Sequence, residues 1–94
     1  MRKIEEKIAY AVRMKKNCGC GNTTVECSNG NVWVYLHGNL IYKEFEGVKS
    51  FTLAGWNTVT TRSRLNALGV DVRQKNWEPV YDGKVISSYS WYNI

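Results

Sequence analysis

Hydrophobic residues recur with two different periods along the chain. In residues 2–16 the apolar positions have helical spacing, with charged residues between them: Ile4, Ile8, Ala11 and Val12. This spacing predicts an amphipathic helix with a narrow apolar stripe. From Thr23 onward apolar and polar residues alternate, which is the period of a β-strand. The chain is therefore expected to begin with a helix and to continue as strands.

Turn-forming residues divide the alternating segment into short strands. Asn29-Gly30 is typical of a two-residue β-hairpin turn, and Gly38-Asn39 and Glu46-Gly47 follow at short intervals. The simplest arrangement of the strands between these turns is an antiparallel meander. In residues 32–37, valines and leucine alternate with Trp33, Tyr35 and histidine, so both faces of this strand are largely apolar or aromatic.

A second helix is predicted at about residues 58–68. Threonines at its start supply hydroxyl groups for an N-cap, and Gly69 suits the position that ends a helix. Leu65 and Leu68 would face the sheet, with Val59 or Thr61 a turn earlier. Residues 70–75, 77–81 and 85–92 are expected to form further short strands.

These elements predict an α+β fold with an antiparallel β-meander of four or more strands, one packed helix and an N-terminal helix or arm. The expected organisation is a basic arm at residues 1–16, a linker at 17–22 and a single α+β domain at 23–94. A chain of 94 residues is enough for one hydrophobic core and too short for two.

The composition of the chain bears on its membrane association and its cellular compartment. The longest apolar stretch is residues 32–36, far short of a membrane span, and the basic N-terminus is followed by charges where a signal peptide is apolar. Three cysteines, Cys18, Cys20 and Cys27, are a poor disulfide framework and fit a reducing compartment. We therefore expect no membrane association and a location in a bacterial or host-cell cytoplasm.

The net charge of +5 is unevenly distributed. Residues 1–16 hold six basic residues against two acidic ones, so the remainder of the chain is nearly neutral. A basic segment of this kind attracts phosphates or acidic protein surfaces, although basic ends also occur as solvated tails.

Two segments resemble a group of small proteins encoded by tailed bacteriophages. The first is Leu36-His37-Gly38-Asn39-Leu40-Ile41, and the second runs from Gly55 to Leu68 as Gly-Trp-Asn-Thr-Val-Thr-Thr-Arg-Ser-Arg-Leu-Asn-Ala-Leu. Similar strands at residues 21–25 and 69–75 extend the resemblance to about residues 21–80, whereas the two ends of the chain depart from it. The resemblance implies a viral origin but no activity.

The sequence contains few candidates for metal-binding or catalytic residues. Cys18, Cys20, Cys27 and His37 could supply four zinc ligands, but a Cys-x-Cys pair fits one ion poorly, and free thiols are the simpler interpretation. His37 is the single histidine, no paired acid accompanies it, and a turn residue is the simpler role. We therefore predict no enzyme activity, no metal and no cofactor.

Binding is the function that the sequence favours. Cations and aromatic side chains suggest nucleic acid as the first candidate partner, bound by Lys3, Lys7, Arg13, Lys15, Lys16, Arg62, Arg64, Trp33 and Tyr35. The aromatic residues could instead pack in the core. Arg62 and Arg64 could instead lie on the solvated surface of a capped helix.

The alternative is a protein–protein inhibitor of a host enzyme, polymerase or defence complex, which would dock the apolar stripe of the arm and the Tyr/Trp-rich tail. The edge strands at residues 85–92 could also pair between chains, so a homo-oligomer stays open.

Overall fold

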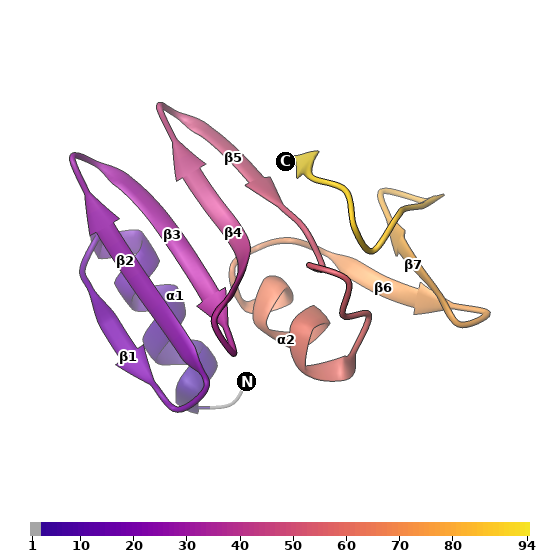
Figure 1. Ribbon diagram of the computed structural model, residues 1–94, viewed down its shortest axis with the longest axis horizontal. Coiled ribbons are helices and arrows are strands. Elements are labelled where there is room, and N and C mark those ends of the chain that lie inside the picture. Colours follow the sequence, from indigo (N-terminus) through magenta and orange to yellow (C-terminus); the bar gives the residue numbers. More distant parts are fainter. Residues whose placement is uncertain (1–2) are drawn as a thin grey trace.

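The computed structural model describes residues 3–94 and contains two helices and nine strands (Figure 1). In chain order these are α1 (Lys3–Met14), β1 (Cys18–Cys20), β2 (Thr23–Ser28), β3 (Asn31–Leu36), β4 (Asn39–Phe45), β5 (Val48–Phe51), α2 (Val59–Ala67), β6 (Val72–Lys75), β7 (Glu78–Tyr81), β8 (Lys84–Val85) and β9 (Tyr92–Asn93). The first two residues of the predicted arm lie outside this described part.

The main sheet has six antiparallel strands in the order β1-β2-β3-β4-β5-β9. Strands β1 to β5 follow one another as a meander because two-residue turns join them, and β9 returns from the end of the chain to pair with β5. The predicted α+β fold with an antiparallel meander and two helices is confirmed.

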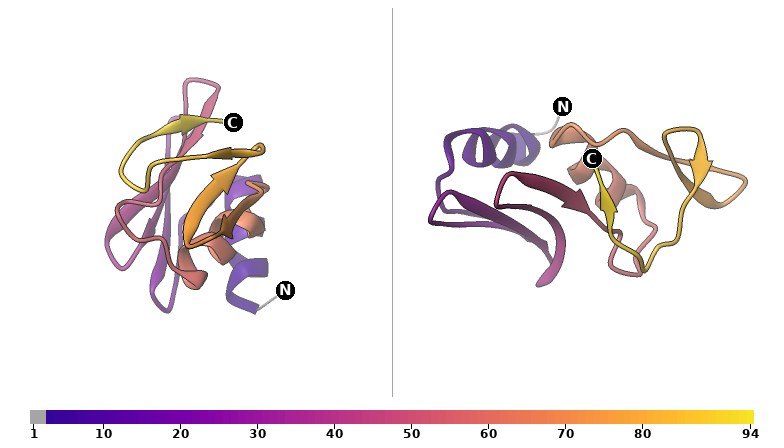
Figure 2. Two further views of the ribbon diagram at one scale, coloured as in Figure 1. Left: turned by 90° about the vertical axis from the view of Figure 1, so that its right-hand side faces the viewer. Right: turned by 90° about the horizontal axis from the view of Figure 1, so that it is seen from above.

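The hydrophobic core lies between the sheet and the two helices, which cover the same face (Figure 2). Ile8, Ala11 and Val12 of α1 pack there, as the helical spacing predicted, together with Leu65 of α2. The segment 1–16 therefore contributes to the common core from residue 3 onward, and α1 contacts β1, β2 and α2.

Residues 17–22, expected to be a linker, include the edge strand β1. Cys18, Gly19 and Cys20 pair with β2, and the Asn17 side chain accepts a hydrogen bond from the Cys27 amide at 2.7 Å. Pairing satisfies backbone groups that a free linker would leave to water, which is why this glycine-rich segment is ordered.

A second antiparallel sheet, β6-β7-β8, follows α2. Its Tyr81 ring packs edge-on against Phe51 of the main sheet, with 4.9 Å between ring centroids, and Val70, Val72 and Ile86 join the core. The predicted strands at residues 70–75 and 77–81 are present, but they belong to this separate sheet, and only the ends of the predicted strand 85–92 are extended.

Helix α2 begins and ends as the sequence indicated. The Thr58 hydroxyl accepts a hydrogen bond from the Thr61 amide, and Gly69 adopts a left-handed conformation (φ +93) just past the C-cap. Of the two candidates for the inner face, Thr61 is buried and Val59 is 66% exposed.

Candidate functional site

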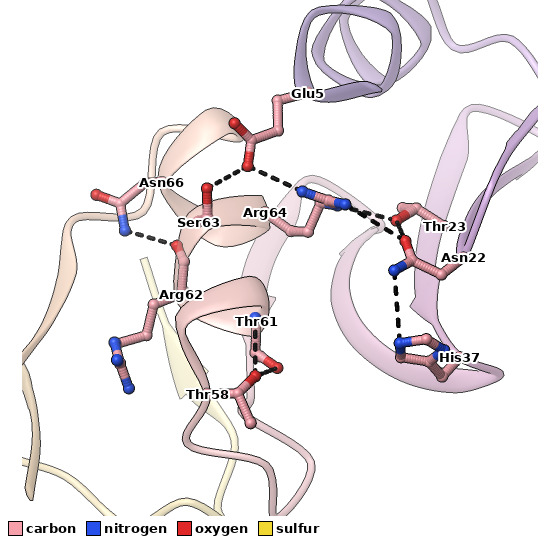
Figure 3. A network of polar contacts seen from close by, with 10 residues as sticks. All are labelled: Glu5, Asn22, Thr23, His37, Thr58, Thr61, Arg62, Ser63, Arg64 and Asn66. Carbon is pink, nitrogen blue, oxygen red and sulfur yellow. Dashed lines mark hydrogen bonds and ion pairs between the residues drawn. The ribbon is translucent and has the colours of Figure 1, made fainter. Parts of the chain in front are cut away.

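A buried polar network joins the two helices to the sheet (Figure 3). Arg64 of α2 donates to the Glu5 carboxylate of α1 at 3.0 Å and to the Thr23 hydroxyl of β2 at 3.1 Å. Ser63 donates to the same Glu5 oxygen. Because the Arg64 guanidinium spans three elements, it fixes how α1 and α2 sit on the sheet.

The network continues to the turn between β3 and β4. The Asn22 side chain accepts from Arg64 at 3.4 Å, and its amide nitrogen lies 3.4 Å from Nε2 of His37. His37 occupies the first position of a two-residue turn with φ +51. The histidine thus lies in a turn beside Asn22, the kind of role that its position next to Gly38 suggested.

The two arginines of α2 have different surroundings. Arg64 is 4% exposed and paired, so it presents no charge to a ligand at the surface. Arg62 is half-buried and donates to the Asn57 side chain in the loop before the helix. The two therefore do not form one cationic site, and Arg64 is not part of an exposed surface.

The basic residues of α1 and of the two positions after it are mainly exposed. Lys3, Lys7, Arg13 and Lys16 are exposed, and Arg13 and Lys16 both lie over the Tyr10 ring, at 5.6 and 5.8 Å from its centroid. Lys15 instead donates to the Gly30 carbonyl at 2.9 Å and lies 3.5 Å from Glu44. We call Lys3, Lys7, Tyr10, Arg13 and Lys16 the basic helix face.

A second surface is formed by the main sheet on the side away from the helices. Strand pairing places alternate residues of β2 to β5 on this side, with Trp91 and Asn93 of the last segment beside them. We call this surface the open sheet face; its residues are Thr24, Glu26, Trp33, Tyr35, Leu40, Lys43, Phe45, Val48, Ser50, Trp91 and Asn93.

Aromatic rings dominate the open sheet face. Trp33 and Phe45 are neighbours, with ring centroids 6.4 Å apart, and Lys43 lies 4.5 Å above the Trp91 ring. Phe45 is 46% and Trp91 40% exposed. Between them lies a hollow of about 360 Å³, lined by Lys43, Phe45, Glu46, Val48, Ser50, Trp91 and Asn93.

Trp33 and Tyr35 therefore lie where period two predicted, opposite the buried Val32, Val34 and Leu36. Tyr42, which strict alternation with Leu40 would place on the open sheet face, is buried instead. A β-bulge shifts the register between Val34 and Tyr35, so Tyr42 pairs with Val34 on the core side. Lys43 and Phe45 complete the face; their alternation with Glu44 was the pattern that could have identified them.

The basic helix face and the open sheet face lie on opposite sides of the molecule. Helix α1 covers the core side of the sheet (Figure 2), and its basic residues are exposed to solvent. The predicted nucleic-acid residues therefore do not form one continuous surface: the lysines and arginines of α1 are on one side, and Trp33 and Tyr35 are on the other.

A cavity of about 450 Å³ opens between the β3–β4 turn and the start of α2. Leu36, Ile41 and Leu53 form its buried apolar part, while Trp56 and His37 lie at its exposed edge. Asn39, Thr58, Thr60 and Thr61 complete the lining. The two segments that carry the phage-protein resemblance thus meet around one cavity.

The remaining reactive groups are dispersed. Cys18, Cys20 and Cys27 are free and half-buried, and burial raises the pKa of the Cys27 thiol. Within residues 3–94 no three side chains of the metal-binding types come together. Tyr42 donates to Glu44 at 2.6 Å, and burial followed by this hydrogen bond raises the pKa of the phenol.

The fold and these surfaces define a small α+β protein built from two helices on one side of an antiparallel sheet. No helix in the described residues is long and apolar enough to cross a membrane. The sequence pattern of the Kyanoviridae Gp96 protein family matches residues 1–93, so the chain belongs to this family of bacteriophage proteins. No curated protein and no solved structure matches the chain.

The family match supports the viral origin that the resemblance implied. It also extends beyond residues 21–80, because it includes α1 and the segment after Ser87. The two ends are therefore part of the family region.

Proposed function

We propose that the protein is a small phage accessory protein that binds a host protein through the open sheet face. The observation that carries this proposal is the aromatic surface formed by the exposed Phe45 and Trp91 together with the half-buried Trp33 and Tyr35. Tryptophan and tyrosine supply most of the binding energy in many protein interfaces. A contiguous apolar patch on a small protein is typical of such a contact.

The charge of the open sheet face favours a protein over a nucleic acid. Its charged side chains are Lys43 and Glu26, with Glu46 at the margin of the hollow. Lys43 already lies over Trp91. Nucleic-acid binding depends on an excess of cations that contact phosphates. The open sheet face has no such excess, because its one cation is balanced by an acidic residue.

The hollow beside Trp91 suggests how a partner is held. Its volume of about 360 Å³ is enough for a large side chain from the partner, with Phe45 and Trp91 as apolar walls. Blocking the working surface of a host enzyme, polymerase or defence complex would require no chemistry from the phage protein. The free cysteines fit such a role in the host cytoplasm.

The test is affinity capture from nuclease-treated host extract, followed by titration of the purified partner. We expect one partner that survives nuclease treatment and whose affinity falls at least about tenfold with Trp33→Ala or Trp91→Ala. Tyr10→Ala, which removes an exposed ring from the basic helix face, is the matched control and should leave the affinity unchanged. Equal loss in all three variants would contradict the proposed site.

Nucleic acid is a second candidate, through the basic helix face alone. The favouring observation is that Lys3, Lys7, Arg13 and Lys16 are exposed on one side of the molecule with Tyr10 among them. Binding would be weak, non-specific and steeply dependent on salt.

Electrophoretic mobility of labelled single- and double-stranded nucleic acids, at low and physiological salt, tests this candidate. Lys7→Glu with Arg13→Glu should abolish retention, while Trp33→Ala should leave it unchanged. Absence of retention at low salt would eliminate nucleic acid as a partner of this face.

A further inference from the structure

Five hairpin turns share one backbone conformation, in which both central residues have positive φ; the Ala54-Gly55 turn before α2 has it as well. The five hairpin turns are Asn29-Gly30, His37-Gly38, Glu46-Gly47, Asn76-Trp77 and Asp82-Gly83. Each connects paired strands with a two-residue loop, the type I′ hairpin. Four of them place glycine at the second position, where a side chain is disfavoured, and the fifth places Trp77 there.

Trp77 is also the most exposed large apolar residue in the described chain. It is 88% exposed, with φ +67, and its indole makes no ring contact or hydrogen bond within residues 3–94. The hairpin that carries it is anchored, because Pro79 is buried and its carbonyl accepts from the Ile86 amide at 2.9 Å. A bulky ring in an unfavourable backbone conformation, held out from a fixed hairpin, buries little surface against its own chain.

The same molecule has an unfilled recess suited to such a ring. The cavity beside α2 has a volume of about 450 Å³, within the range of sites that enclose small organic groups. Leu36, Ile41 and Leu53 provide its buried apolar part. The Thr60 hydroxyl, which also lines the cavity, supplies an acceptor of the kind that a buried indole N–H requires.

We propose that Trp77 of one copy inserts into the cavity beside α2 of a second copy, so that the protein self-associates head to tail. The turn that carries Trp77 lies at one end of the molecule, whereas the β3–β4 turn and α2 lie nearer its centre (Figure 1). The 88% exposure of Trp77 shows that its own cavity does not hold it. Because the two contact surfaces differ, the assembly is heterologous and grows as a chain or closes as a ring.

This contact uses neither the open sheet face nor the basic helix face, so it does not depend on the proposed function. It leaves the open sheet face free in every copy. A head-to-tail assembly would therefore present that face repeatedly, and a multivalent partner would be held more tightly than by one copy.

The test is sedimentation velocity of the full chain from micromolar to millimolar concentration, with two complementary variants. Trp77→Gly removes the inserted ring and gives the turn the residue found in its four counterparts. Thr60→Glu places a carboxylate at the cavity opening, at a helix N-terminus where an acidic residue is favourable. Trp91→Ser removes a half-exposed ring from the open sheet face and is the control.

We expect the unmodified chain and the Trp91→Ser variant to associate, and Trp77→Gly and Thr60→Glu each to remain monomeric. An equimolar mixture of the two monomeric variants should form a dimer and nothing larger, because one retains the cavity and the other retains the ring. A monomeric unmodified chain, association of Trp77→Gly equal to that of the unmodified chain, or a mixture that stays monomeric would overturn the proposal.

Discussion

Glu5 and Arg64 form a buried ion pair between α1 and α2, with 3.0 Å between the charged atoms and exposures of 5% and 4% for the two side chains. Each charged group has a further hydrogen bond: Ser63 donates to the Glu5 carboxylate, and Arg64 donates to the Thr23 hydroxyl. Burial without these partners would leave a charge desolvated and uncompensated. The pair therefore links the N-terminal helix to the rest of the fold.

Removing one member of this pair should be strongly destabilising. We expect Glu5→Ala to lower the free energy of unfolding by about 3–5 kcal/mol, because Arg64 would keep its charge inside the protein. The double variant Glu5→Ala/Arg64→Ala should cost less than the sum of the single changes. Urea unfolding of the four proteins measures this coupling.

The exposed pair Asp71–Arg73 provides the control, because its N···O distance is 2.9 Å but its side chains are 66% and 76% exposed. Arg73→Ala should leave the unfolding curve unchanged, since water screens such pairs. A strictly additive result for Glu5 and Arg64 would show that the two charges do not depend on one another.

Adjacent residues of β3 should respond very differently to truncation. Val34 is fully buried, so Val34→Ala should cost about 2 kcal/mol of unfolding free energy. Trp33 lies on the open sheet face, so Trp33→Ala should lower the free energy of unfolding by less, even though tryptophan is the larger side chain. Urea unfolding compares the two. If Trp33→Ala proved the costlier, the ring would be holding the sheet together and would not be reserved for a partner.

The sequence predicted the elements whose determinants are local. Asn29-Gly30 identified the first hairpin, and the Thr58 cap and Gly69 delimited α2, because each depends on a few consecutive residues. The burial of Arg64 depends on Glu5, which is 59 positions away, and no spacing rule connects them. The burial of Tyr42 likewise does not follow from the alternation of residues, because a single bulge reverses the faces of the alternating pattern beyond it.

The two candidate surfaces were likewise predictable from the sequence only where they depend on local residues. Period two placed Trp33 and Tyr35 on the face opposite the valines, and this required only the strand itself. Whether that face joins the basic residues of α1 depends on which side of the sheet the helix packs. The packing of the whole core determines the side on which the helix lies. The separation of the two surfaces could therefore be seen only in the structure.

Stability at high pH should depend on Tyr42. Its pKa is raised above the ordinary value of 10.0 by burial and by the hydrogen bond to Glu44. Above pH 10 the unfolded chain therefore loses the Tyr42 proton while the folded protein keeps it, so the stability due to this group is complete below pH 10 and decreases as the pH rises further.

Urea unfolding of the unmodified chain and of Tyr42→Phe at increasing alkaline pH measures this contribution. The unmodified chain should lose stability more steeply than the variant, since other alkaline groups are common to both. Parallel curves would mean that the phenol ionises equally in the folded and unfolded states.

Gly55 should be intolerant of a side chain. Its φ is +81, and a Cβ there would lie 2.8 Å from Cε1 of Tyr89. The Tyr89 ring can move, so the backbone conformation makes the larger contribution, and Gly55→Ala should cost about 1 kcal/mol or more. Gly19→Ala is the matched control, because Gly19 lies in a strand with open space around its Cα. Equal thermal unfolding of the two variants would contradict this assignment.

Trp77→Gly should make the isolated chain more stable, although it removes a large apolar side chain. The indole is 88% exposed, so little burial is lost, and glycine relieves the cost of the left-handed backbone at φ +67. After allowing for the greater freedom of glycine in the unfolded chain, the expected gain is roughly 0.5–1 kcal/mol. The reciprocal change Gly83→Trp, in the neighbouring turn of the same type with φ +75, should be destabilising. Urea unfolding of both variants at dilute concentration, where self-association does not contribute, measures the two effects. A loss of stability in Trp77→Gly would mean that the ring supports its own hairpin, and the tryptophan would then need no partner to explain it.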